Sequence, residues 1–96
     1  MYLTAHIKSK AGRSEEMKNL LLDLVDGSKS ETACLQYDLH QVSDNPDLFI
    51  FHEEWASRED WELHKTQPHI LKFVQASAEI MDEETIIYQT EKVSRT

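Results

Sequence analysis

Residues 48–70 read LFIFHEEWASREDWELHKTQPHI and contain both tryptophans and three of the five histidines of the chain. The opening segment, 48–55, is rich in aromatic and branched side chains, which favours a β-strand. Ser57 then offers a helix N-cap, followed by acidic residues that suit the helix dipole, so we predict a helix to about Thr66. Pro68 fits the first turn of a further helical segment. The stretch therefore predicts a strand followed by two helical pieces.

Outside this stretch, hydrophobic periodicity predicts the remaining elements. Period-two alternation indicates strands. A stripe of apolar residues with helical spacing indicates a helix that ends near Gly27, or continues briefly through Ser28. The predicted elements are a strand at 2–10, a helix at 14–27, a strand at 34–42, a turn at 43–47 and a last strand at 84–93. The order β-α-β-β-α-β predicts an α+β, ferredoxin-like fold, with a four-stranded antiparallel sheet and both helices on one face.

Composition and charge restrict the class of protein. The chain has 96 residues, 40% hydrophobic and 29% charged, which predicts one globular domain over 1–96 with an ordered core at about 2–92. The net charge of −8 argues against nucleic acid and anionic membranes as partners. No apolar run is long enough to span a bilayer, no signal peptide is recognisable, and Cys34 has no internal disulfide partner, so we expect a cytoplasmic protein.

The strand at 48–55 is substantially apolar on both of its faces. Phe49 and Phe51 lie on one face, and Leu48 and Ile50 lie on the other. Such a strand is normally covered on both sides, but two helices cover only one side of the sheet. We therefore expect a homodimer in which two sheets pack face to face and enclose a cavity.

His64 and Glu53 are the candidate catalytic residues. An imidazole near neutral pKa could deprotonate a phenol, and a carboxylate among apolar neighbours needs a partner, so Glu53 is expected to orient His64. The alternative is a purely structural pair that holds the helix on the sheet. Trp55 is expected to form a wall on which an aromatic substrate stacks.

Further residues are expected to contact substrate. These are Phe51, His69 at a helix start where a neutral ring or an anion is favoured, and His6 and His40 on the polar faces of their strands. No histidine pair has the i, i+4 or H-x-H spacing, so no metal is predicted. With two glycines and no G-x-G pattern, no nucleotide or flavin cofactor is predicted either.

Two patterns carry a resemblance to a known family. Residues 53–69 contain E-x-W, then His64 nine residues after Trp55, then a P-H pair; residues 31–41, ETACLQYDLHQ, are similar to E-x-G-C-x-x-Y-x-L. Together and in order, they resemble the antibiotic biosynthesis monooxygenase family over residues 2 to about 90. Ala33 and Ala11 stand where that family usually has Gly and Pro, which affects turns but removes no chemical group.

The resemblance implies a ferredoxin-like homodimer that forms a dimeric α+β barrel. It further implies a cofactor-independent monooxygenase that oxidises a small quinol or phenol with O₂. The alternatives are an isomerase of the type that acts on a phosphorylated signalling sugar, and a module that binds a metabolite without chemistry. Haem is not expected, because Val74 stands where haem-degrading members carry the axial histidine.

Overall fold

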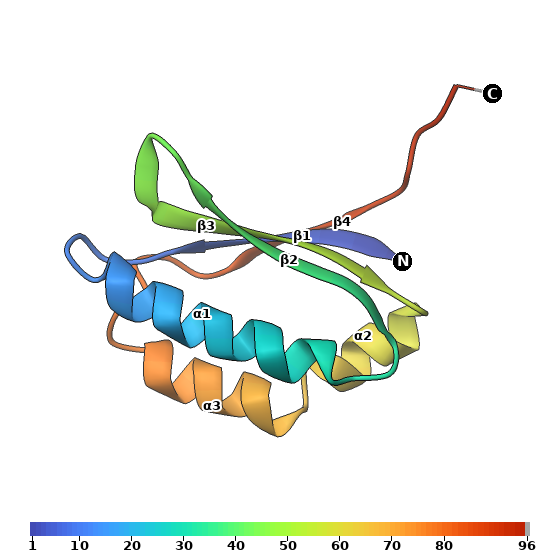
Figure 1. Cartoon of the computed structure of the whole chain (residues 1–96), viewed down its shortest axis with the longest axis horizontal. Helices are drawn as coiled ribbons and strands as arrows, with labels where there is room; N and C mark the ends of the chain where they lie inside the picture. Colours follow the sequence, from blue (N-terminus) through green and yellow to red (C-terminus); the bar gives the residue numbers. More distant parts are fainter. Residues whose placement is uncertain (96) are drawn as a thin grey trace.

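The computed structural model describes residues 1–95. Its elements are β1 (Tyr2–Lys8), α1 (Ser14–Lys29), β2 (Cys34–Val42), β3 (Asn45–Trp55), α2 (Arg58–His64), α3 (Pro68–Ser77) and β4 (Ile86–Thr90). The strands form one antiparallel sheet in the order β2-β3-β1-β4. All three helices lie on one face of it (Figure 1). The predicted α+β, ferredoxin-like fold is confirmed.

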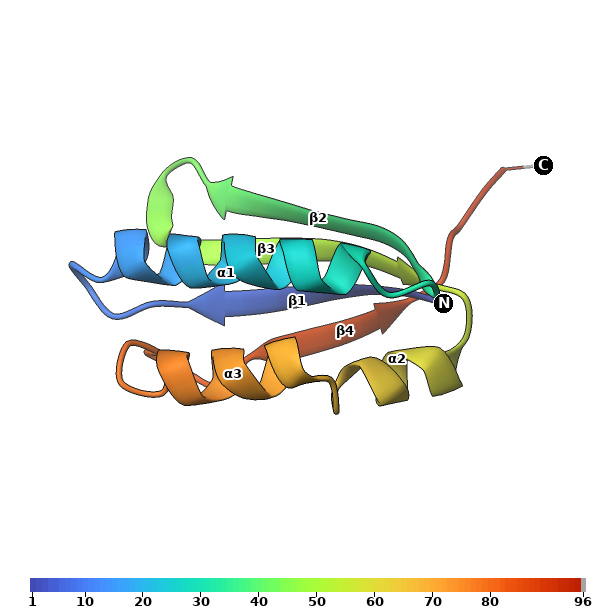
Figure 2. The same cartoon turned by 60° about the horizontal axis from the view of Figure 1, so that its bottom comes forward.

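The core lies between the helices and the sheet. On β3, the alternate residues Phe49, Phe51, Glu53 and Trp55 are all buried, because they point toward the helices with period two. The apolar stripe of α1 packs on them, and Figure 2 shows α1 and α3 side by side in front of the sheet. The sequence pattern therefore assigned the strand residues to two faces, and the structure identifies the covered one.

Gly27 does not end α1, contrary to the prediction. The helix continues to Lys29, although glycine is a weak helix former. A Cβ atom at Gly27 would lie 2.7 Å from Cγ of His69. The glycine therefore permits α3 to approach α1 closely, which is a packing role rather than a stop signal.

Several strand boundaries also differ from those predicted, and β1 ends at Lys8 rather than at residue 10. The turn between β2 and β3 is only Ser43–Asp44, and β3 already begins at Asn45. Pro46 is tolerated there because the pairing of β1 with β3 reaches only Leu48, so this end of β3 has one neighbouring strand. β4 is shorter than the predicted 84–93.

The second face of the sheet carries no helix in residues 1–95 (Figure 1). Ile86 and Tyr88 of β4 pair with His6 and Thr4 of β1 on this face, and they are 46% and 57% exposed. The homodimer that would cover this face stays a prediction. No helix in the described part of the chain is both long and apolar enough to cross a membrane.

Candidate functional site

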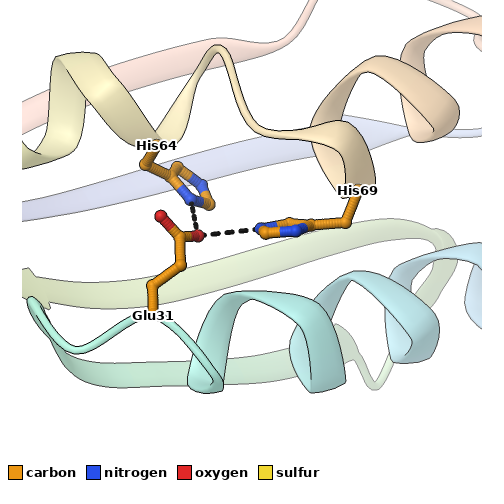
Figure 3. Close-up of side chains that lie close together, drawn as sticks. All are labelled: Glu31, His64 and His69. Carbon is orange, nitrogen blue, oxygen red and sulfur yellow. Dashed lines mark hydrogen bonds and ion pairs between the residues drawn. The ribbon is translucent and has the colours of Figure 1, made fainter.

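Three side chains from three separate segments meet where α1 ends (Figure 3). Glu31 lies on the bend between α1 and β2, His64 is the last residue of α2, and His69 is the second residue of α3. Oε2 of Glu31 lies 2.6 Å from Nδ1 of His64 and 2.8 Å from Nε2 of His69. Because one carboxylate oxygen serves both contacts, each imidazole presents an N–H toward Glu31.

Local sequence fixes both histidines. The Oγ of Ser57 accepts a hydrogen bond from the backbone N–H of Asp60 at 3.1 Å, as predicted for the N-cap of α2. Pro68 occupies the first position of α3, where its missing N–H costs nothing. These two signals set where α2 and α3 begin, and hence the position of His64 and His69 along each helix.

His64 is buried, with 3% of its surface exposed. Its ring centroid lies 4.3 Å from that of Trp55 and 5.7 Å from that of Tyr37. Burial lowers the pKa of His64 below its usual value, and the nearby Glu31 carboxylate opposes that shift. Within residues 1–95 the Nε2 atom forms no hydrogen bond, so this nitrogen is free to accept a proton.

The expected pairing of Glu53 with His64 is wrong. Nε1 of Trp55 donates to Oε1 of Glu53 at 2.9 Å, whereas His64 pairs with Glu31. Trp55 lies two residues after Glu53 and therefore on the same face of β3, so it reaches the carboxylate first. Burial raises the pKa of Glu53 to about 7, and the Trp55 hydrogen bond only partly offsets this rise.

A cavity of about 320 Å³ lies between the helices and the sheet. His64, Glu53, Tyr37 and Phe51 line it among mostly apolar side chains. Its volume is at the lower end of the range for ligand-binding pockets, about 300–1,000 Å³. The cavity therefore lies within one chain, and His64, Glu53 and Phe51 of the predicted site residues reach it.

The other predicted substrate contacts are elsewhere. His6 and His40 both pair with Ile50 of β3, which places them on the open face of the sheet, away from this cavity. There His6 contacts Thr4 and Tyr88, and His40 contacts His52. Both histidines lie on the polar faces of their strands, as the alternation predicted. The cavity, however, lies on the other face of the sheet.

Trp55 and His69 do not line the cavity, but both contact His64, which does. Trp55 is 1% exposed and packs between Glu53 and His64, so it holds both candidate catalytic side chains rather than lining the cavity. His69 contacts the Glu31 carboxylate through Nε2, and its ring is a neighbour of the His64 ring.

Glu31 and Tyr37 were not predicted as site residues. Both belong to the pattern in residues 31–41, where Glu31 supplies the E and Tyr37 the Y, and this was the available signal. Burial raises the pKa of Tyr37 above its usual range, so its phenol stays protonated. Glu31, His64 and His69 also bring three potential metal-ligand atoms within 4.8 Å of one another, whereas spacing alone predicted no metal.

The fold and the site define a small α+β protein with a histidine–glutamate pair at the wall of an apolar pocket. The family model for the antibiotic biosynthesis monooxygenases matches residues 1–76. The chain belongs to the antibiotic biosynthesis monooxygenase family.

The chain is also similar to two individual proteins and to one solved structure. The chain is 28% identical over 89 residues to "Putative monooxygenase YcnE" of Bacillus subtilis, covering 93% of this chain and 94% of that protein. It is 27% identical over 79 residues to protein sll1783 of Synechocystis, covering 82% of this chain and 54% of that protein; the chain thus spans about half of that relative. The crystal structure of PA3566 from Pseudomonas aeruginosa superposes with a TM-score of 0.91 at 31% identity, covering 97% of this chain and 93% of that one.

Proposed function

We propose that this chain is a monooxygenase that oxidises a small quinol or phenol with O₂ in the cavity between the helices and the sheet. The observation that carries the proposal is His64, whose ring lines the cavity while its Nδ1 is held by Glu31 at 2.6 Å. A histidine held in this way keeps Nε2 as a base with a fixed direction. The mostly apolar lining suits an aromatic ring.

In the proposed first step, Nε2 of His64 takes the proton from the substrate hydroxyl. The resulting imidazolium is stabilised by the Glu31 carboxylate, as in other carboxylate–histidine pairs. The phenolate is more easily oxidised than the phenol, and the apolar cavity provides few groups that would stabilise its charge. Glu31 is therefore assigned the orienting role that was expected of Glu53.

The proposed reaction balances without a bound cofactor. A phenol and O₂ give a quinone and water: one oxygen atom forms a bond to the ring carbon, and the other leaves as water with two hydrogens from the substrate. The substrate supplies all four electrons that reduce O₂. Cofactor-independent oxygenation, with O₂ and a small aromatic molecule as the partners, is therefore part of this proposal.

We also propose that the working unit is a homodimer. The open sheet face carries exposed Ile86 and Tyr88, and a second copy of the same face would cover them. The cavity beside His64 is on the opposite side of the sheet, so the dimer would support the sheet without closing that cavity.

Oxygen uptake with a panel of quinols and phenols tests the proposed reaction. We expect turnover by the wild type, and a loss of about 10²–10⁴-fold in His64→Gln, the typical contribution of a general base. His52→Gln, on the open sheet face, is the matched control and should retain activity. Substrate consumption without O₂ would favour the isomerase, and binding without consumption would favour the metabolite-binding module.

A further inference from the structure

We propose that Glu31, His64 and His69 bind a divalent transition-metal ion of the zinc class. Their ligand atoms are Oε2 of Glu31, Nδ1 of His64 and Nε2 of His69, and they come from three separate segments that converge on one point (Figure 3). This inference goes beyond the proposed oxygenation, which uses the other nitrogen of His64.

The chemistry of the donor atoms selects the type of ion. Two imidazoles and one carboxylate form a common zinc ligand set, with a further position left for water. Imidazole nitrogens favour zinc, copper, iron or nickel over magnesium and calcium. The Glu31 carboxylate forms no ion pair with Lys or Arg within the described chain, and its only charged-group contacts are the two histidines. A divalent cation would supply the positive charge that the cluster lacks.

The ligand atoms must separate slightly to admit an ion. Oε2 of Glu31 lies 2.6 Å from Nδ1 of His64 and 2.8 Å from Nε2 of His69. Two ligand atoms of a tetrahedral zinc with bonds of about 2.0–2.1 Å lie roughly 3.4 Å apart. Glu31 is on a bend rather than within a helix or strand, and its side chain is 17% exposed. A small rotation of this side chain opens the cluster while both histidines stay in place.

Both histidines are held by the surrounding structure. His64 packs on Trp55, and His69 packs on Gly27 so closely that a Cβ atom there would lie 2.7 Å from its ring. The His69 side chain is nevertheless 22% exposed, which gives an ion a route from solvent. A site with fixed ligands and an entry path meets two of the requirements for metal binding.

Metal binding and the proposed oxygenation compete for His64. An ion on Nδ1 takes the lone pair of that nitrogen, so the ring proton of the neutral imidazole lies on Nε2, which then cannot accept a proton from the substrate. We therefore expect zinc to slow oxygen uptake by the wild type. Binding itself is measured without any substrate, so a failure of the metal proposal is distinguishable from a failure of the proposed oxygenation.

Calorimetric titration of chelator-treated protein with ZnCl₂, and the visible spectrum after addition of CoCl₂, test this site. We expect one ion per chain in the wild type. Glu31→Gln and His69→Gln should bind zinc at least about tenfold more weakly than the wild type. Loss of a residue that only hydrogen-bonds to a metal ligand already weakens metal binding by this factor. The control is the double variant His40→Gln/His52→Gln, which removes the other close histidine pair and should bind as the wild type does.

Two results overturn the proposal: a wild type that binds no zinc or cobalt, or unchanged binding in both Glu31→Gln and His69→Gln. Binding that is lost only in the control variant also overturns it, because the ion would then sit on the open sheet face. If a site variant does not fold, NMR of the wild type replaces it. Zinc must then shift the ring signals of His64 and His69 before those of His40 and His52.

Discussion

The two carboxylates of the site, Glu31 and Glu53, differ in burial and in their hydrogen-bond partners. Glu31 shares one oxygen between two histidines and is partly exposed, whereas Glu53 is 5% exposed and has the Trp55 N–H as its partner. A neutral N–H compensates a buried negative charge only in part. Glu53 is therefore the residue whose protonation should be coupled most strongly to folding.

Replacing Glu53 by Gln should remove a pH dependence of stability. The folded-state pKa of Glu53 is raised from 4.5 to about 7, so the folded protein holds this proton more tightly than the unfolded chain. Its contribution to stability is present below pH 4.5 and is lost as pH rises to about 7, by up to about 3 kcal/mol. Glu53→Gln should keep the Trp55 hydrogen bond and be more stable than the wild type above pH 7. The free energy of unfolding of both proteins is measured by urea denaturation between pH 4.5 and about 7. A difference between the two proteins that does not change with pH would contradict the raised pKa of Glu53.

Truncating His64 should destabilise the fold as well as stop turnover. His64→Ala removes a buried ring from Trp55 and leaves Glu31 with one partner, at a cost of about 1–3 kcal/mol. His52→Ala on the open face serves as the control, and its free energy of unfolding should change by less than about 0.5 kcal/mol. Equal stability of the two variants would show that His64 does not hold this corner together.

At the scale of elements, the junction of α1 with α3 positions His69. The helix tolerates a glycine at position 27 because the His69 side chain occupies the space that a Cβ would need. Here the contact between two helices outweighs the local preference of the chain, since a helix-interior glycine costs about 1 kcal/mol relative to alanine.

Gly27→Ala should therefore destabilise the protein rather than stabilise it. The added methyl group meets Cγ and Cβ of His69 at 2.7 and 2.8 Å, and overpacking of this kind costs about 1–3 kcal/mol. Asp26→Ala, one position earlier on an exposed site, is the control and should be nearly neutral. Both are measured by urea denaturation, and a gain in stability for Gly27→Ala would show that His69 is free to move away.

The elements were predictable from sequence, but the partners within the site were not. Ser57 and Pro68 are local signals, so they placed α2 and α3 correctly. Period two placed Glu53 on the buried face of β3. The partner of His64, however, is Glu31, 33 positions away, and their contact depends on how the end of α1 packs against the α2–α3 junction. No local pattern contains that information, and only the resemblance in residues 31–41 pointed to Glu31.

At the scale of the whole molecule, the sheet has one covered face and one open face. Phe49 and Phe51 belong to the covered face and are 0% and 1% exposed, so an aspartate at either position should unfold the chain rather than test for a dimer. The informative positions are on the open face.

Tyr88→Asp should convert the predicted dimer into a folded monomer. Light scattering should give twice the 11.2 kDa chain mass for the wild type and the chain mass for the variant, because a charge buried between two sheets is unfavourable. Leu63→Asp, on an exposed position of α2, is the control and should stay dimeric. A wild type with the mass of one chain would contradict the dimer.

Oxygenation with His64 as the base is tested most directly by incorporation of oxygen-18 from ¹⁸O₂. The wild type and His64→Gln are compared with the panel substrate that gives the fastest oxygen uptake. The product is reduced immediately after quenching, so that its carbonyl oxygen does not exchange with water. The mass of the reduced product is then measured by mass spectrometry. We expect one labelled oxygen atom per product molecule from the wild type, and almost no labelled product from His64→Gln over the same time. Equal labelling by the two proteins, or no labelled product from the wild type with any substrate of the panel, would contradict it.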